Sequence, residues 1–225
     1  MNIALRTCMI TLGVLTSATA GIPASVAERN WTSSPTPAAI RTGLEAVDLM
    51  DGDIILRRTS GLRGRIARTS DLSGTYSHAG LVSLLGGKRT VVHADPESKN
   101  DKHGSVIRTS LDDFADNSFV ERVAVYRLRS RDSTQINRAM RWVAVHAVRG
   151  TPFDSQFDAS DSTAMYCTEL IWRAYRVAGI DIVAPAKRGV GSLFSIDSLI
   201  LLSGIEKSLL LRRVHASPNP EISPI

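Results

Sequence analysis

The sequence has little cysteine, and this scarcity excludes a fold built on disulfides. Only two cysteines, Cys8 and Cys167, occur in 225 residues. Small exported domains without a sufficient core carry several paired cysteines, so this chain must depend on an apolar core. Once a leader containing Cys8 is removed, Cys167 is a lone thiol. It is then either a small buried apolar side chain or a group kept for its reactivity.

Long apolar runs are lacking as well. The run from Cys8 to Leu15 is far shorter than the roughly 20 residues that span a bilayer. It follows Arg6 and precedes small residues, which is the layout of a secretory signal peptide over residues 1–27. Cleavage after Ala27 is favoured and cleavage after Ala20 is the alternative. We therefore expect a periplasmic or secreted protein without a transmembrane segment in the mature chain.

Neither sign of charge dominates. The net charge of +5 becomes +4 without Arg6, a modest basic excess that favours anionic envelope surfaces over nucleic acid as partners. An arginine-rich segment is interpreted as solvated loop, with contact to anionic wall polymer or lipid headgroups as the alternative; it contains Arg57, Arg58, Arg63, Arg65 and Arg68.

One domain is expected after the leader, because the remaining 198 residues suffice for one substantial core. The Ser- and Pro-containing residues 28–43 are predicted to be a flexible linker, 44–216 the domain, and 217–225 a C-terminal tail. Apolar patterning predicts an α+β fold. Strands are expected at 54–56, 77–85, 90–94, 120–128 and 208–214, and helices at 111–115, 134–149 (capped by Ser133), 164–177 and 195–202.

Cys167 falls in the first turn of the predicted helix 164–177. A helix N-terminus and a nearby imidazole lower the pKa of a thiol, which is how a cysteine nucleophile is activated. The sequence therefore allows Cys167 to be a nucleophile if the fold brings a histidine to it.

Two histidines stand on neighbouring predicted strands. A tight turn at Gly86-Gly87 would place His78 opposite residues 93 to 95, so that the His78 and His93 imidazoles are adjacent. Such a neighbour can hold the orientation of a general base. The small residues Ala79 and Gly80 leave room beside His78 for a substrate or for the cysteine helix.

Other interpretations of the histidines stay open. A histidine in a strand is often a satisfied core residue, and His103, His146 and His215 are interpreted as surface residues. A zinc site of Cys167, His78 and His93 is disfavoured because closely paired ligands are lacking. We expect no metal and no organic cofactor.

Five segments together resemble a known family. They are Gly52–Leu56, Ser77–Val82, Val91–Ala94, Pro152–Asp154 with Phe157, and Tyr166–Leu170. In order and spacing over residues 52–180 they are similar to the circularly permuted papain-like cysteine hydrolases of the NlpC superfamily, YiiX/YebB/YaeF-like branch. The resemblance implies an antiparallel sheet packed against helices that include the nucleophile helix. It also implies Cys167 as nucleophile, His78 as base and His93 as the third polar residue.

The resemblance implies an amidase or peptidase acting on peptidoglycan peptides or related amides. The alternative is a thiol lipase, acyltransferase or thioesterase acting on lipid esters, because many YiiX-like members have a glutamate at the place of His93 and a histidine there is similar to the lecithin:retinol acyltransferase-like branch. The Tyr-Cys-Thr-Glu-Leu motif and the lack of a hydrophobic C-terminal anchor favour the amidase. A second alternative is a non-catalytic envelope-binding module in which Cys167 is merely buried.

Three further residues are candidates for the substrate site: Tyr166, Glu169 and Tyr76. For Tyr166 and Glu169 a structural role is equally open, since a helix dipole alone favours a carboxylate in the first turn. Asp154 is interpreted as a turn or supporting residue.

Overall fold

The structure, a computed structural model, describes residues 42–60, 75–97, 103–116, 120–183 and 199–217. Its centre is a six-stranded sheet in the order β4-β3-β2-β1-β5-β6, in which all neighbouring strands are antiparallel. The strands are β1 (Ile54–Thr59), β2 (His78–Ser83), β3 (Thr90–Asp95), β4 (Ser105–Ser110), β5 (Val120–Leu128) and β6 (Leu211–Ala216). The leader, the linker except for Thr42 and Gly43, and the tail except for Ser217 lie outside the described residues and stay predictions.

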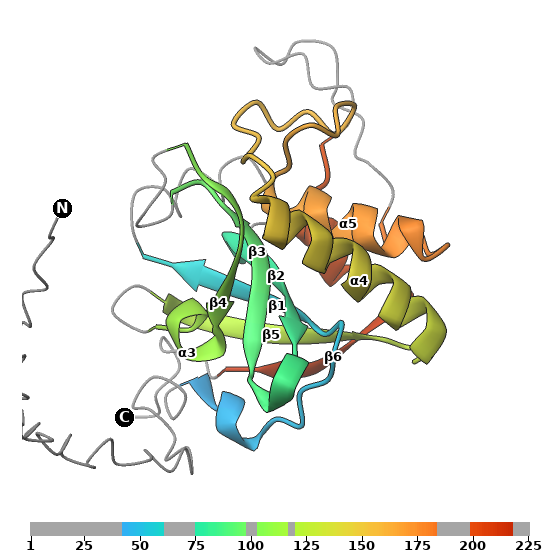
Figure 1. The fold of residues 1–225 in the computed structure, drawn as a ribbon. Coiled ribbons are helices and arrows are strands. Elements are labelled where there is room, and N and C mark those ends of the chain that lie inside the picture. Colours follow the sequence, from blue (N-terminus) through green and yellow to red (C-terminus); the bar gives the residue numbers. More distant parts are fainter. Residues whose placement is uncertain (1–41, 61–74, 98–102, 117–119, 184–198, 218–225) are drawn as a thin grey trace, which may run out of the picture. The chain divides into compact units, whose positions relative to one another are not determined.

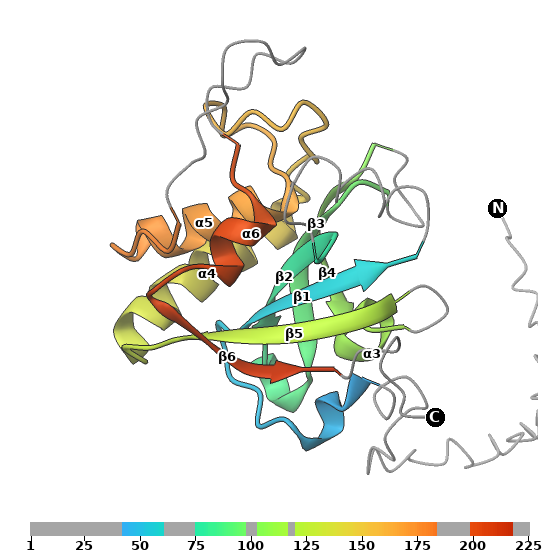
Figure 2. The ribbon, with the colours of Figure 1, turned by 180° about the vertical axis from the view of Figure 1, so that it is seen from behind.

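The longer helices pack together beside the sheet (Figure 1). Figure 2 shows the short helix α6 near them when the molecule is viewed from behind. The helical elements are η1 (Leu44–Ala46), η2 (Leu85–Gly87), α3 (Leu111–Phe114), α4 (Ser133–Arg149), α5 (Cys167–Val177) and α6 (Leu202–Glu206). Among the residues described, no helix combines the length and the apolar character that crossing a bilayer requires.

Strand alternation divides the core between the two faces of the sheet. On β1, Ile54 and Leu56 belong to the cluster that includes the apolar faces of α4 and α5, while Ile55 belongs to a second cluster with Phe114 of α3. Successive side chains of a strand point to opposite faces, so a sheet covered on both sides needs such continuous apolar runs. The α+β fold predicted from the sequence is confirmed.

The predicted pairing of β2 with β3 is correct. Gly86 and Gly87 turn the chain with φ of 66° and 72°, a left-handed conformation that glycine adopts without strain. Leu81 pairs with Val92, which is within the register expected from the turn.

Two boundaries near the ends of helices differ from expectation. Helix α4 is capped by Asp132 and not by Ser133, because the Asp132 carboxylate accepts hydrogen bonds from the backbone N–H groups of Thr134 and Gln135. The helix predicted at 195–202 is wrong for 199–201, since α6 begins only at Leu202; residues 195–198 lie outside the described part.

Two strands also differ from the sequence-based prediction. Strand β4 was not expected at all, and β6 begins at Leu211 rather than at residue 208. Both lie at the edges of the sheet, where one side of the strand has no partner strand among the described residues. At an edge, pairing with one neighbour decides the boundaries more than local pattern does.

The arginine-rich segment is not simply solvated loop. Arg57 and Arg58 belong to β1, and Arg57 is partly buried, with its guanidinium carbon 4.4 Å from the centre of the Phe114 ring. Arg58 forms an ion pair of 2.7 Å with Glu121. The solvated interpretation is therefore wrong for Arg57, because an aromatic face and a carbonyl hold its guanidinium. Arg63, Arg65 and Arg68 lie outside the described residues.

Candidate active site

Cys167 is the first residue of α5, as its predicted place in the first turn requires. The helix forms because Leu170, Ile171 and Ala174 recur on one face and are fully buried against the sheet. Cys167 itself is partly exposed and is not in a disulfide. The residue therefore lies at the margin of the core, with its thiol turned inward.

Backbone N–H groups surround the sulfur of Cys167. Burial is the main influence and raises the pKa of the thiol to about 11, while hydrogen bonds from the backbone at Ala79, Thr168 and Cys167 itself oppose that rise. These donors favour the thiolate and, equally, any oxygen anion that forms beside it. The resting group is nevertheless a protonated thiol at neutral pH.

His78 and His93 are joined by a hydrogen bond of 2.9 Å between His78 Nε2 and His93 Nδ1. His93 Nε2 lies 3.2 Å from the hydroxyl oxygen of Thr109 on β4. Both histidines are buried and both pack against the ring of Phe114. The predicted adjacency of the two imidazoles is confirmed.

Both imidazoles are held neutral. Burial lowers the pKa of His78 well below its usual value, and the positive charge of Arg57, followed by the neighbouring His93, lowers it further. Burial, followed by Arg57, lowers the pKa of His93 to about 3. A neutral imidazole has one N–H and one free lone pair, so the direction of the hydrogen bonds decides which nitrogen of His78 can take a proton.

The row of hydrogen-bonded groups His78, His93 and Thr109 allows two arrangements of the protons. If His93 Nε2–H donates to Thr109, then His93 Nδ1 accepts from His78 Nε2–H, and His78 Nδ1 is left with a lone pair. If Thr109 donates instead, His78 carries its proton on Nδ1. Only the first arrangement leaves His78 able to act as a base through Nδ1.

The Cys167 thiol lies beside the beginning of β2, the strand that starts with His78. The backbone N–H at the sulfur is that of Ala79, the residue after His78, and the charge of Arg57 acts on both groups. Arg57 is the cross-strand neighbour of His78 on β1 and donates from Nη1 to the carbonyl of Phe114 over 2.9 Å. The fold therefore brings the start of α5 to the start of β2, although the two lie 89 positions apart in the sequence.

Comparison with known proteins shows the family of the chain. Residues 48–192 match the family described as permuted papain-like amidase enzymes, YaeF/YiiX, C92 family. The chain belongs to this family. A similar solved structure is that of yiiX from Escherichia coli O157:H7, described as a metalloprotein, with a TM-score of 0.61 and 19% identity over 74% of this chain and 96% of that one. No curated protein matches the chain.

Membership of the YaeF/YiiX family indicates papain-like amidase or hydrolase chemistry. The described residues include no group of three or more His, Cys, Asp or Glu side chains that could hold a metal ion. The facing nitrogens of His78 and His93 are also occupied by each other. The residues described thus do not fit a metal site of the kind that the name of the yiiX protein suggests.

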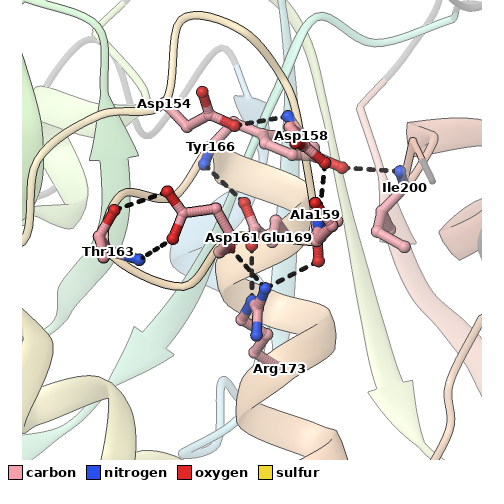
Figure 3. A network of polar contacts seen from close by, with 10 residues as sticks. Asp154, Asp158, Ala159, Asp161, Thr163, Tyr166, Glu169, Arg173 and Ile200 are labelled. Carbon is pink, nitrogen blue, oxygen red and sulfur yellow. Dashed lines mark hydrogen bonds and ion pairs between the residues drawn. The ribbon is translucent and has the colours of Figure 1, made fainter. Parts of the chain in front are cut away.

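Glu169 lies inside the first turn of α5 and is completely buried. Its Oε1 accepts a hydrogen bond of 2.5 Å from Arg173 Nε, and its Oε2 accepts from the backbone N–H of Tyr166 over 3.4 Å. Arg173 also donates to the carbonyls of Ala159 and Asp161 (Figure 3). These contacts favour the structural role for Glu169, in which it fixes the start of the helix and the loop before it.

Tyr166 and Tyr76 are both buried. Tyr166 is 1% exposed, and its hydroxyl oxygen accepts a hydrogen bond of 2.7 Å from the N–H of Ile200. The phenol of Tyr76 has Tyr126 and Glu206 as electrostatic neighbours, so it faces β5 and α6. Tyr166, the residue before Cys167, is therefore fixed within the core, and among the described residues the neighbours of the Tyr76 phenol lie on β5, β6 and α6 and not at Cys167.

The other predicted placements have mixed outcomes. Gly80 leaves no room for a substrate, because a Cβ on it would collide with Val91 and lie 3.2 Å from the Cβ of His93. His103 is exposed, as expected, but His146 and His215 are partly buried and bond to Thr151 and to the carbonyl of Thr42.

Sequence reasoning missed two groups near the imidazoles, Arg57 and Thr109. Arg57 directly follows the predicted strand 54–56. Extending that strand by one residue would have indicated that Arg57 belongs to the sheet. Thr109 had none, because its strand was not recognised.

Proposed function

We propose that this protein is an exported cysteine amidase or peptidase that cleaves peptides of the cell wall or related amides. Cys167 is the nucleophile, His78 the general base and His93 the residue that orients the base. The observation that carries the proposal is the His78–His93 hydrogen bond at the start of β2, beside the strand residue whose N–H faces the Cys167 sulfur. Family membership supports the amide chemistry.

The proposed reaction uses these residues in turn. The Cys167 thiol gives its proton to His78 Nδ1 while the sulfur bonds to the amide carbon, and the N–H groups at the start of α5 stabilise the oxyanion. His78 returns the proton to the leaving amine as the C–N bond breaks. Water then adds to the thioester, passes a proton to His78, and the acid leaves as Cys167 regains its thiol.

The proposal is tested on purified peptidoglycan and on phospholipid offered side by side, with products identified by mass. We expect cleaved amides from peptidoglycan, and no cleavage by Cys167→Ala or His78→Ala. Undiminished cleavage by either variant would remove that residue from the mechanism. Fatty acid released from phospholipid would instead identify the thiol lipase or acyltransferase.

A second candidate is a non-catalytic binding module. The observation that favours it is the high pKa of the Cys167 thiol, which burial raises to about 11. A buried, protonated cysteine without chemistry would have the same property. Binding of peptidoglycan without any product, unchanged in Cys167→Ala, would establish this candidate.

Export rests on the predicted signal peptide. We expect the protein in the periplasmic or secreted fraction, with an N-terminus at residue 28 or 21. The intact mass of the fractionated protein checks this. A full-length chain in the cytoplasm would contradict export without affecting the chemistry.

A further inference from the structure

The loop that leads into α5 holds an aromatic residue in an unusual backbone conformation. Phe157 has φ of 58°, in the left-handed region that non-glycine residues enter at a cost of about 1–3 kcal/mol. The Asp154 carboxylate accepts hydrogen bonds from the N–H groups of Gln156 at 2.8 Å and Asp158 at 2.6 Å, on either side of Phe157. The surrounding chain therefore imposes this conformation on Phe157.

The conformation does not bury the Phe157 side chain, which remains 40% exposed. Its ring lies 5.3 Å from the ring of Tyr166 and 6.0 Å from that of Phe153. Tyr166 directly precedes Cys167 and is fixed by its bond to Ile200, as Figure 3 shows. An exposed apolar ring thus rests on a rigid base one residue away from the proposed nucleophile.

Fixed negative charges lie close along the same loop. The carboxylates of Asp158 and Asp161 accept hydrogen bonds from the backbone N–H groups of Ser160 and Thr163. These bonds lower the pKa of both aspartates, so both are ionised at neutral pH. An anionic group beside Phe157 would meet like charges, whereas an uncharged apolar group would not.

We propose that Phe157 is the wall of an apolar subsite beside Cys167, which takes an uncharged aromatic or branched aliphatic group next to the scissile carbonyl. This specificity rests on the proposed function for its biological meaning. Recognition by the subsite does not depend on hydrolysis, however, because a thiol reagent that carries the same group must pass the same wall.

The test compares the rates at which three reagents alkylate Cys167 in the purified protein at pH 9: iodoacetamide, N-benzyl iodoacetamide and iodoacetate. We expect the benzyl reagent to react about tenfold faster than iodoacetamide, and iodoacetate to react most slowly. Phe157→Gly should remove the benzyl preference, so that N-benzyl iodoacetamide and iodoacetamide react at similar rates. Glycine suits the positive φ, so this variant should fold.

Two further variants separate recognition from general surface effects. Phe157→Leu should keep part of the benzyl preference, since it keeps an apolar side chain. Val148→Ala, which removes an 89% exposed apolar side chain from α4, should keep the whole benzyl preference. The inference is overturned if Phe157→Gly reacts with the same benzyl-to-iodoacetamide ratio as the unmodified protein. Loss of labelling with every reagent would instead count against the reactive thiol itself, and so against the proposed function.

Discussion

At the scale of single residues, the site combines a protonated thiol with neutral imidazoles. Burial raises the pKa of Cys167 and lowers those of His78 and His93, and Arg57 adds to the lowering at both histidines. A preformed thiolate–imidazolium pair is therefore disfavoured at rest. In the proposed reaction the proton moves to His78 as the sulfur attacks, when the surrounding N–H groups meet a developing negative charge.

The pH dependence of alkylation checks this resting state. Because only the thiolate reacts, the rate with iodoacetamide should be low at pH 7 and rise with pH towards the thiol pKa of about 11. The rate against pH, followed by mass spectrometry at Cys167, measures it. A plateau reached below about pH 8.5, the usual thiol value, would show that the thiolate is already formed at rest.

Thr109 is expected to set the proton position on His78 through His93. In the arrangement with a lone pair on His78 Nδ1, the Thr109 hydroxyl accepts from His93 Nε2–H; Thr109→Val removes this acceptor and so removes what favours that arrangement. We expect kcat to fall about tenfold with KM unchanged, as for partial loss of general-base catalysis.

Thr109→Ser is the matched control for this prediction. It keeps the hydroxyl and should restore most of the rate. If Thr109→Val is as active as Thr109→Ser across the pH profile, Thr109 has no part in orienting the base.

At the scale of elements, buried contacts fix the start of α5, where the proposed nucleophile Cys167 lies. Burial raises the pKa of Glu169 to about 7, with Arg173 opposing the rise. Above that pH the carboxylate is ionised and depends on Arg173, whose side chain is 21% exposed. The start of the helix is thus held by an ion pair with one member wholly inside the protein.

Arg173→Met should destabilise the protein by about 3–5 kcal/mol at pH 8, because it leaves an unpaired buried charge. At pH 5 the loss should be smaller, since Glu169 then carries a proton and needs no cation. Urea unfolding at the two pH values measures the difference. Arg58→Met, which removes an ion pair with about one third of each side chain exposed, should cost at most about 1 kcal/mol. An equal loss for Arg173→Met at both pH values would contradict the role assigned to Glu169.

The elements also show what the sequence could predict. The pairing of β2 with β3 follows from a glycine turn and local apolar runs, so the His78–His93 contact was accessible. The contact of Arg57 beside the imidazoles could not be predicted, because its partner, the carbonyl of Phe114, lies 57 residues away in the sequence. Thr109 was inaccessible for a similar reason, since β4 is defined by its pairing with β3 rather than by its own pattern.

At the scale of the whole molecule, β1 connects a purely structural end of the sheet with the reactive end. At its start the Asp53 carboxylate accepts hydrogen bonds from Arg127 Nε at 2.7 Å and Nη2 at 2.6 Å, and both residues are buried. Tyr175 of α5 donates to the carbonyl of Gly52 in the same region. At the other end of β1, Arg57 stands opposite His78. Stability and reactivity therefore depend on different residues of one strand.

Asp53→Asn tests this separation. It leaves the buried Arg127 guanidinium without its counter-charge, so the free energy of unfolding should fall by about 3–5 kcal/mol. The alkylation rate of Cys167 in the folded protein should stay the same, because the substitution lies at the far end of β1 from His78. Asp51→Asn is the control: the exposed Asp51 accepts a hydrogen bond from the Leu84 N–H, which an amide oxygen can also accept, so stability should change by less than about 0.5 kcal/mol. If Asp53→Asn changes the alkylation rate at temperatures well below its unfolding transition, the two ends of the sheet are coupled and the separation is wrong.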